Sequence, residues 1–453
     1  MEISVYCVGS EILKHEMDKI GPSAWNSSWY KSISPALHNP LRIVILKSNM
    51  TKVFTAGGLI TISLQTLITM QIFRKYGYLG ETHEIETEDG YLLDVHRIPP
   101  KTPDPNLPPV LLMHGLMGSS ENFILLGPKR SLAYMLSDKG YDIWMPNSRG
   151  NFHSRKHRTL DPDHNNTYWM FSWHEIGKYD LPACIDYILE STGKPDLIYA
   201  GHSQGTTVFF VMASERPEYQ SKIRLSMSLA PSVFLEHTKH PILRAVSKYY
   251  RYWDRLVLQT NQHEFIPFVS NDAIRYMFKF LCSKPGRLQD LCSNLMFMLI
   301  GFAPEQLDKK IIPLVTATVP AGSSARQALH YAQEIVTGKF RQYDFGKREN
   351  RRRYNTTIPP DYNLNISTPI GLFYAENDML NDVRDVTKLS KVLPNVVKMY
   401  EVPYKQFTHF DFIVAKDVKT LVYMEVFDLM KKYNYNLDIN TDDTGDNYNN
   451  VKK

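Results

Sequence analysis

Short hydrophobic runs alternate with amphipathic stretches along most of the chain, as strands alternate with helices in many folds. The run 110–113 is continuously apolar, as is typical of a strand buried on both faces. The predicted strands cover residues 110–113, 141–145, 197–200, 225–229, 370–375 and 396–400. The predicted helices cover about residues 131–138, 180–190, 206–214 and 417–431. This alternation indicates an α/β fold with a mainly parallel central sheet covered on both faces.

Two segments depart from the alternation. Residues 87–98 contain an Asp89-Gly90 pair between two strand-like halves, which predicts two strands around a tight turn. Between about 233 and 347 the chain has helical and loop patterns, with only ambiguous short apolar runs. We therefore expect a helical insertion, called the cap, at residues 233–347. It interrupts a core formed by residues 74–232 and 348–433.

The two ends of the chain differ from the region between them. Residues 1–49 lack clear periodicity, and we interpret them as an extension outside the folded domain. Residues 50–73 begin with Met50 and a lysine and continue into an apolar run, which is typical of a secretory signal peptide. A signal-anchor helix over about 53–73 is the alternative, although its Thr, Ser and Gln residues disfavour a stable span. Residues 434–453 are rich in Asn and Asp, which predicts a disordered polar tail.

Composition limits the possible partners. The chain has 453 residues, of which 43% are hydrophobic, and a net charge of only +5. It has no dense stripe of Lys and Arg, so nucleic acid is not expected as a partner. The basic cluster 351–353, beside Lys347 and Arg348, is interpreted as a solvated loop, with an interaction patch as the alternative.

Cysteines and glycosylation sequons bear on the compartment. Four cysteines are too few to establish an oxidising environment. Cys282 and Cys292 are ten positions apart in one helical segment and could close a small loop, whereas the other two are expected to be unpaired. Five Asn-x-Ser/Thr sequons occur, and three of them lie in polar, loop-like sequence suited to glycan acceptors of a secreted protein. The three candidate glycosylation sites are Asn165, Asn355 and Asn365.

The pentapeptide 201–205 is the most informative sequence in the chain. It reads Gly-x-Ser-x-Gly and lies where a predicted strand ends and a predicted helix begins. Gly201 and Gly205 lack the Cβ atoms that would clash in a sharp turn between the two elements. Ser203 is therefore a candidate nucleophile, whereas an accidental match in a surface loop is the alternative.

A serine nucleophile needs a base, and the base needs a carboxylate that orients it. Asp378 and His409 follow the predicted strands 370–375 and 396–400, and side chains after parallel strands meet at one edge of a sheet. The chain order Ser203, Asp378, His409 is the order expected for an α/β-hydrolase. Solvated loop residues are the alternative reading for Asp378 and His409.

Other carboxylates and histidines compete for these roles. Asp382 and Asp385 suit the N-terminus and first turn of a following helix. Asp411 is too close to His409 in sequence to orient it easily, and we expect it to tie down the histidine loop. His202 is interpreted as packing beneath the serine turn, and His114 as structural.

Attack on a carbonyl produces an oxyanion, which needs preorganised N–H donors. One expected donor is the backbone N–H of Gln204, directly after the serine at a helix N-terminus. The other is the backbone N–H of Leu116, in the loop after strand 110–113, where Gly115 allows close backbone approach.

Several longer motifs resemble the acid lipase family, which includes the gastric and lysosomal lipases and their insect relatives. The resemblance covers about residues 74–433, nearly the whole folded part. The motifs are HGLMGSS at 114–120, NSRGN at 147–151, FSWHE at 171–175, KYDLPA at 178–183, GHSQG at 201–205, NDML at 377–380 and HFDF at 409–412. Several motifs in one order are more specific than the serine pentapeptide alone.

The resemblance implies an α/β-hydrolase fold and hydrolysis of long-chain lipid esters, such as triacylglycerols or steryl esters, by a secreted or lysosomal enzyme. Ser203, Asp378 and His409 fall on the family's triad positions, and Leu116 and Gln204 on its oxyanion positions. The Cys282–Cys292 pair falls where the family has a disulfide in its cap. No metal or redox cofactor is implied, and the expected partners are the lipid substrate and the lipid–water interface. The oligomeric state is left open.

The sequence departs from the family pattern in places. Thr408 stands where an asparagine usually precedes the histidine, the Asp378–His409 interval is slightly long, and residues 347–353 are additional basic sequence. The extension 1–49 also has no counterpart in the family. None of these differences removes a catalytic group, but they leave substrate preference and pH optimum open.

The cap contains runs rich in aromatic residues and methionine, at 249–253, 276–281 and 295–300. Such runs usually form core, but together they suit a cover over an acyl-chain groove. Two alternatives remain, a short-chain carboxylesterase and a catalytically silent lipid-binding protein on the same fold. A complete triad argues against the silent protein, and a comparison of long- and short-chain esters would identify the esterase.

Overall fold

The computed structural model describes residues 54–56, 60–62, 64–265 and 303–434. A nine-stranded sheet forms the centre of this part of the chain, in the order β11-β10-β9-β8-β5-β6-β4-β3, with β7 paired to β4. The strands from β11 to β6 are parallel, and β4 joins β6, β3 and β7 in antiparallel pairs. The sheet is therefore mainly parallel, and the α/β prediction is confirmed. The strands are β3 (Glu81–Glu86), β4 (Tyr91–Ile98), β5 (Val110–Met113), β6 (Ile143–Pro146), β7 (Lys156–His157), β8 (Leu197–His202), β9 (Ile223–Leu229), β10 (Ile370–Tyr374) and β11 (Val396–Glu401).

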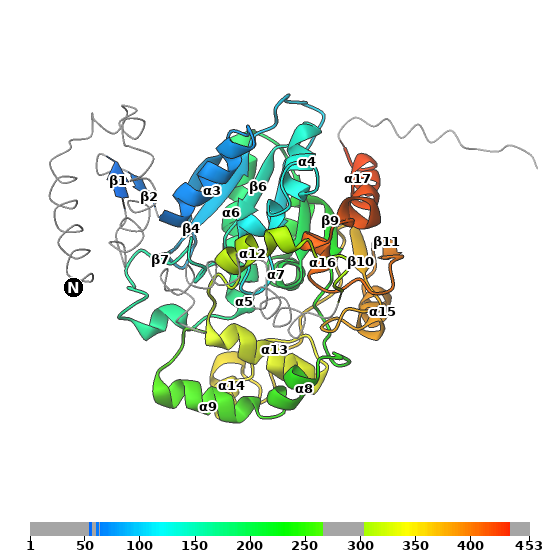
Figure 1. Ribbon diagram of the computed structural model, residues 1–453. Helices are drawn as coiled ribbons and strands as arrows, with labels where there is room; N and C mark the ends of the chain where they lie inside the picture. Colours follow the sequence, from blue (N-terminus) through cyan, green and yellow to red (C-terminus); the bar gives the residue numbers. More distant parts are fainter. Residues whose placement is uncertain (1–53, 57–59, 63, 266–302, 435–453) are drawn as a thin grey trace, which may run out of the picture.

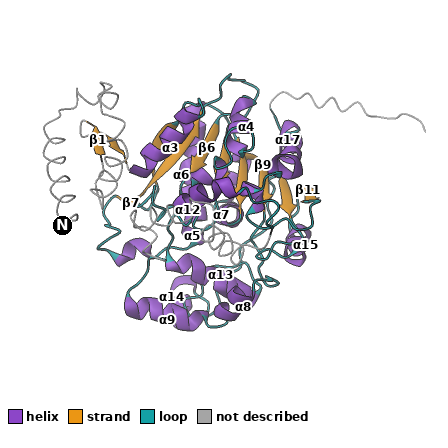
Figure 2. Ribbon diagram, viewed as in Figure 1, coloured by secondary structure: helices purple, strands orange, loops and turns teal. Residues whose placement is uncertain are grey.

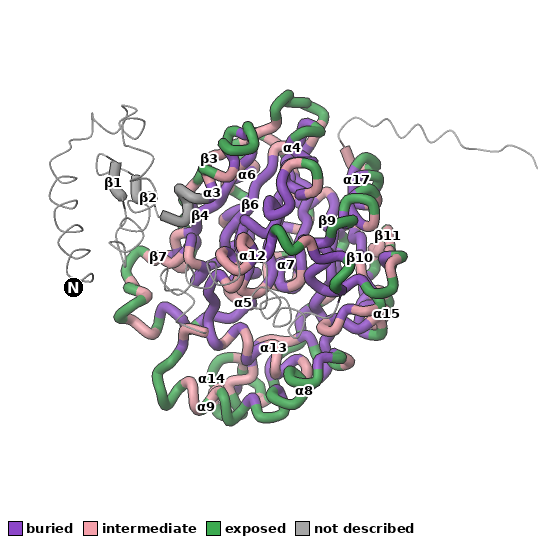
Figure 3. The backbone as a smooth tube through the Cα atoms, viewed as in Figure 1, coloured by how far each residue is buried: buried purple, intermediate pink, exposed green. Residues whose placement is uncertain are grey.

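Helices cover both faces of this sheet (Figure 2). Alternate residues of β5 separate the two faces: Val110 and Leu112 join one core, whereas Leu111 and Met113 join the other. The helices of the first face are α3 (Leu64–Lys75), α4 (Leu132–Asp138), α16 (Asp411–Val414) and α17 (Met424–Lys431). Those of the second face are α6 (Leu181–Thr192), α7 (Gln204–Glu215) and α15 (Val383–Val392). Burial on both faces explains why the central strands are continuously apolar (Figure 3).

Element boundaries shift from the predicted ones by a few residues at several points. The Asp89-Gly90 pair is in a turn as expected, but the strand before it is β3, upstream of the predicted segment 87–98. The helix predicted at 417–431 begins as a π-helical segment, Lys419–Tyr423, which continues into α17. Similarly, a π-helical segment, Ile176–Asp180, precedes α6.

The described part of the cap is helical and extends past its predicted end. In Figure 1, α8 (Pro241–Ser247), α9 (Tyr250–Thr260), α13 (Ala325–Thr337) and α14 (Lys347–Tyr354) lie together at the bottom of the molecule. A further helix, α12 (Ile312–Thr318), precedes α13. The basic cluster 351–353 belongs to α14, so it is solvated as expected but is not a loop. The predicted boundary at 347 therefore falls at the start of a helix beside the other cap helices.

The folded domain extends upstream of the predicted boundary at residue 74. Thr69 and Phe73 of α3 are fully buried, and the ring of Phe73 meets those of His96 and Tyr134 edge to face. Before α3, the segments β1 (Phe54–Ala56) and β2 (Ile60–Ile62) pair as strands, so this part is not one helix over 53–73. Within the described residues, no helix has the length and apolar character needed to cross a bilayer. The roles assigned to residues 1–49 and 50–73 remain predictions.

The remaining predictions concern the cysteines, two cap runs, the tail and the glycan acceptors. Cys282, Cys292 and the cap runs 276–281 and 295–300 lie outside the described residues, as does nearly all of the predicted tail. Cys184 is buried and unpaired. The candidate glycan acceptor Asn365 is exposed, as is Asn355 at the end of α14, whereas the partly exposed Asn165 caps a short 3-10 helix.

Candidate active site

Ser203 lies in a sharp turn between β8 and α7. Its backbone has φ +55° and ψ −120°, a conformation that is rare for residues other than glycine. A Cβ on Gly201 would lie 2.5 Å from the backbone of Gly205, and a Cβ on Gly205 would overlap the carbonyl of Met113. The two glycines are therefore required by the close approach of three backbone segments. This turn holds the Ser203 side chain at the carboxyl end of the sheet.

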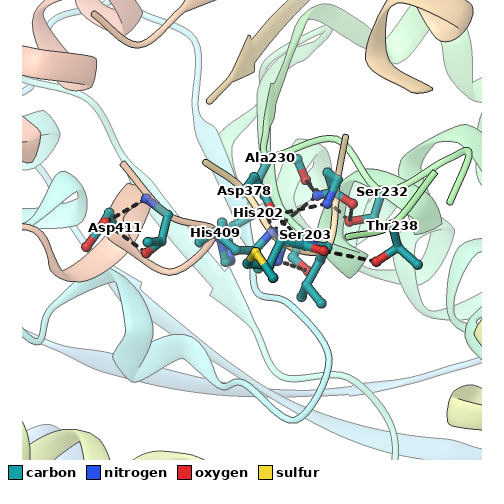
Figure 4. Close-up of polar contacts among 12 residues, drawn as sticks. His202, Ser203, Ala230, Ser232, Thr238, Asp378, His409 and Asp411 are labelled. Carbon is teal, nitrogen blue, oxygen red and sulfur yellow. Dashed lines mark hydrogen bonds and ion pairs between the residues drawn. The ribbon is translucent and has the colours of Figure 1, made fainter. Parts of the chain in front are cut away.

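The structure brings Ser203, His409 and Asp378 together (Figure 4). His409 Nε2 lies 2.8 Å from Ser203 Oγ, and His409 Nδ1 lies 2.8 Å from Asp378 Oδ2. Because a carboxylate accepts, Nδ1 carries the proton, and Nε2 is free to accept the serine hydroxyl proton. The arrangement can therefore activate a hydroxyl as a nucleophile.

Backbone donors fix the Asp378 carboxylate. Its Oδ1 accepts from the N–H groups of Leu380 at 2.8 Å and Asn381 at 3.0 Å. Asp378 is 1% exposed and His409 4% exposed, so both groups act away from bulk water. One carboxylate oxygen is used for positioning and the other for the imidazole, which leaves little freedom of orientation.

The competing carboxylates have the other roles expected of them. Asp382 caps α15 by accepting from the N–H of Arg384, and Asp385 accepts two hydrogen bonds from His237. Asp411 accepts from the N–H and the hydroxyl of Thr408, which ties down the histidine loop. Burial raises the pKa of Asp411 to about 6. The negative charge of nearby Asp378 also raises this pKa, whereas the hydrogen bonds from Thr408 lower it.

His202 does more than pack beneath the turn. Its Nε2 lies 2.9 Å from the backbone carbonyl of His409, and since a carbonyl only accepts, this nitrogen is protonated and donates. Burial, with the neighbouring His409, lowers the pKa of His202 to about 3. No local sequence pattern predicts this contact, because the two residues are 207 positions apart.

Asn381 is a second residue that the sequence prediction missed. Its Nδ2 donates to the Ala230 carbonyl at 2.9 Å, and its Oδ1 accepts from the Ser232 hydroxyl at 3.1 Å. Its amide nitrogen also lies 3.2 Å from His409 Nδ1. Asn381 thereby links the loop that carries Asp378 to the chain that follows β9.

The two expected oxyanion donors lie near Ser203. Gln204 is the first residue of α7, where a backbone N–H has no intrahelical partner. A Cβ built on Gly115 would lie 3.0 Å from Ser203 Cβ, so the loop before Leu116 packs directly against the nucleophile. Within the described part of the chain, neither the Leu116 nor the Gln204 N–H donates to another protein atom. Both roles remain predictions.

One group of side chains among the described residues has the spacing of metal ligands, Glu236, His237 and Asp385. Protein partners already engage these groups: Glu236 pairs with Lys388 at 3.1 Å, and Asp385 accepts from the backbone and ring of His237. Because the bonds join the start of the cap to α15, we assign the group a structural role.

Comparison with known proteins identifies the family. A protein-family model described as alpha/beta hydrolase fold matches residues 108–415, more than half of the chain. A second, described as partial alpha/beta-hydrolase lipase region, matches residues 69–127. Lipase 1 of Drosophila melanogaster is 42% identical over 373 residues, covering 81% of this chain and 80% of the relative. The chain belongs to the acid lipase family of α/β-hydrolases.

Vertebrate relatives support the same assignment. Human gastric triacylglycerol lipase is 36% identical over 386 residues, covering 81% of this chain and 92% of the relative. Lysosomal acid lipase/cholesteryl ester hydrolase of Macaca fascicularis is 35% identical over 390 residues, covering 84% of this chain and 94% of the relative. A putative lipase from Sulfolobus solfataricus is similar in fold, with a TM-score of 0.52 at 12% identity over 78% of this chain and 94% of that one. The second family match begins at residue 69, which agrees with a folded domain that starts before residue 74.

Proposed function

We propose that this protein hydrolyses carboxylic esters of neutral lipids, triacylglycerol or steryl ester, through an acyl-enzyme on Ser203. Membership of the acid lipase family makes it a carboxylic-ester hydrolase. Two of its relatives are named as a triacylglycerol lipase and a cholesteryl ester hydrolase, which supports the two lipid classes. The observation that carries the proposed site is the pair of 2.8 Å contacts joining Ser203, His409 and Asp378.

The reaction proceeds in two steps. His409 Nε2 accepts the Ser203 proton while Ser203 Oγ bonds to the ester carbonyl carbon, and the carbonyl oxygen becomes an oxyanion. The N–H groups of Leu116 and Gln204 stabilise this charge. The intermediate collapses as the ester bond to the alcohol breaks, and His409 gives its proton to the departing alcohol. A water molecule then repeats the sequence on the acyl-enzyme, which releases the fatty acid and restores Ser203.

Exposed side chains of the cap support lipid esters as the substrate class. Helices α8 and α9 expose large apolar side chains to solvent: Tyr252 is 59% exposed and Leu258 53% exposed. Val246, on α8, is 43% exposed. Exposed apolar surface on one side of a soluble domain suits contact with a lipid–water interface. Arg244, Lys248 and Arg255 are also exposed on these helices, and none of them has an ion pair to another described residue.

We place the enzyme in a secreted or lysosomal compartment. Two relatives are named for the stomach and the lysosome, and the predicted signal segment and sequons agree with an export route. Mass analysis of the protein isolated from its source would test this: glycans on Asn355 and Asn365 support it, whereas bare sequons with an intact residue 1 oppose it.

Covalent labelling tests the proposed site. An organophosphonate lipid analogue should modify Ser203, located by mass mapping, and Ser203→Ala should abolish labelling and lower turnover by several orders of magnitude. Ser137→Ala is a matched control, because this buried serine donates to the Pro99 carbonyl and contacts no proposed catalytic group. Label on another residue, or normal turnover in Ser203→Ala, would refute the site.

A further inference from the structure

His114 follows β5 and has a contact at each end of its ring. It is 2% exposed, its Nδ1 lies 2.8 Å from the carbonyl oxygen of Gly115, and its Nε2 lies 3.1 Å from the backbone nitrogen of Ser148. A carbonyl accepts and a backbone N–H donates, so Nδ1 carries the proton and Nε2 has none. Burial lowers the pKa of His114 to about 4, which favours this neutral form. The contacts therefore specify a single tautomer.

The Nε2 contact holds the ring in place. Ser148 follows β6, and the residue before it, Asn147, is bonded through its backbone N–H and its side-chain amide to the carbonyl of Asp94 on β4. Because this segment is fixed to the sheet, its N–H is a fixed reference point for the imidazole. The Nδ1–H is consequently aimed at one oxygen, that of Gly115.

The Gly115 carbonyl determines where the next N–H points. The peptide between Gly115 and Leu116 is trans, since the cis peptide bond among the described residues is Val319–Pro320. In a planar trans peptide the C=O and the N–H point in opposite directions. A carbonyl held by His114 and by the N–H of Gly118, at 3.0 Å, therefore fixes the direction of the Leu116 N–H.

Other contacts of the loop act downstream of this peptide. The carbonyl of Met117 accepts from Ala321 at 2.7 Å, and that of Gly118 accepts from Asn151 Nδ2 at 2.8 Å. Met117 has φ +56°, so the backbone reverses directly after Leu116. These bonds hold the far side of the loop, but a rotation of the Gly115–Leu116 peptide would be opposed chiefly by His114 and Gly118.

We propose that His114 is a positioning residue that holds the Gly115–Leu116 peptide with its N–H toward the oxyanion of the Ser203 reaction. This inference rests on the proposed function, because it assigns a reason to one of the two expected oxyanion donors. Without the Nδ1–H, the peptide can rotate and present a carbonyl oxygen where the donor is needed, which would repel the developing charge.

Two substitutions separate the ends of the imidazole. In His114→Asn, the side-chain amide nitrogen takes the place of Nδ1 and can still donate to Gly115. In His114→Gln, the longer side chain reaches the place of Nε2 and can accept from Ser148, but Gly115 loses its side-chain donor. Since an oxyanion donor contributes about 10²–10³ in kcat in other hydrolases, we expect His114→Gln to lower kcat about 10- to 100-fold with little change in KM. His114→Asn should retain kcat within about threefold.

The readouts distinguish positioning from packing. A soluble ester gives kcat and KM, and the rate of phosphonylation of Ser203 should fall in parallel with kcat, because that reaction uses the same donors. Thermal unfolding of both variants shows whether the fold is retained. Equal losses in kcat for the two variants, or normal kcat in His114→Gln, would overturn the proposal.

The tautomer of His114 can be measured directly in the unmodified protein. ¹⁵N NMR of labelled histidine should show His114 protonated at Nδ1 and unprotonated at Nε2 at neutral pH, and finding the opposite tautomer would overturn the proposal. The phosphonate labelling of Ser203 in the unmodified enzyme is measured first. Its absence would count against the proposed function, whereas normal labelling with a failed histidine test counts only against the role of His114.

Discussion

The catalytic edge of the sheet and the outer face of the cap are built in opposite ways. At the catalytic edge, hydrogen bonds between buried groups hold the reacting side chains, as in the Asp378 carboxylate, which accepts from two backbone N–H groups and His409. On α8 and α9, large apolar side chains are exposed, and nearby cations have no ion pairs among the described residues. The first region is specified by internal bonds, whereas the second has apolar surface that the described fold does not cover.

The two regions meet two different requirements of a lipase. Chemistry at an ester needs groups held in one geometry, and hydrogen bonds away from water provide it. Contact with a lipid surface needs apolar area, which depends little on the position of single atoms. Substitutions at the catalytic edge should therefore change the rate on every ester, whereas those on the cap face should change it only on lipid aggregates.

The largest effect is expected for Asp378→Asn. An amide in this place no longer stabilises the imidazolium and can favour the wrong tautomer of His409, so kcat should fall by about 10³–10⁴ on soluble and aggregated esters alike. Steady-state kinetics on both substrate types measures it. Asp382→Asn is the matched control, since this carboxylate caps α15 and asparagine caps a helix equally well. A similar loss in both variants would show that Asp378 has no special role.

The next effect concerns the pH dependence of stability. A carboxyl whose pKa is about 6 when folded, against an ordinary 3.8, binds its proton more readily in the folded state. Asp411 should therefore cost stability at neutral pH, and this cost should disappear as the pH falls through 6 toward 4. A rise of this size corresponds to a cost on the order of a few kcal/mol at neutral pH.

Asp411→Asn removes this titration while the side-chain oxygen can still accept from Thr408. The variant should be more stable than the parent at pH 7, and the two should converge near pH 4. Chemical unfolding at both pH values measures the free energy of unfolding. A constant difference between pH 4 and 7 would show that Asp411 does not titrate as stated.

The smallest effect is expected on the cap face. Val246→Asp places a charge among exposed apolar side chains and should lower activity on emulsified triacylglycerol about tenfold, since burying one such side chain contributes about 1.5–3 kcal/mol. Activity on a soluble short-chain ester should stay unchanged. Val392→Asp, at the end of α15, is the matched control with similar exposure, 48% against 43%. If both variants behave alike on emulsions, the α8–α9 face has no particular role in lipid contact.

Much of the catalytic edge could be predicted from local sequence. The continuously apolar runs at β5 and β8 specify buried parallel strands, because only strands covered on both faces need so few polar residues. Gly201 and Gly205 specify a sharp turn, because any Cβ there would overlap neighbouring backbone. The chain order of Ser203, Asp378 and His409 then follows from the positions of the strand ends.

Tertiary structure alone decided how these groups are supported. The contacts of His202 with the His409 carbonyl and of Asn381 with Ala230 join residues 207 and 151 positions apart, and no local pattern encodes such pairs. The sequence marked His114 only as a structural residue, because the tautomer of a histidine depends on the partners that folding brings to its two nitrogens. Hydrophobic periodicity and turn residues act over a few positions and thus determine elements and their order. Hydrogen bonds between remote segments form only after the sheet has assembled, so they depend on the whole fold.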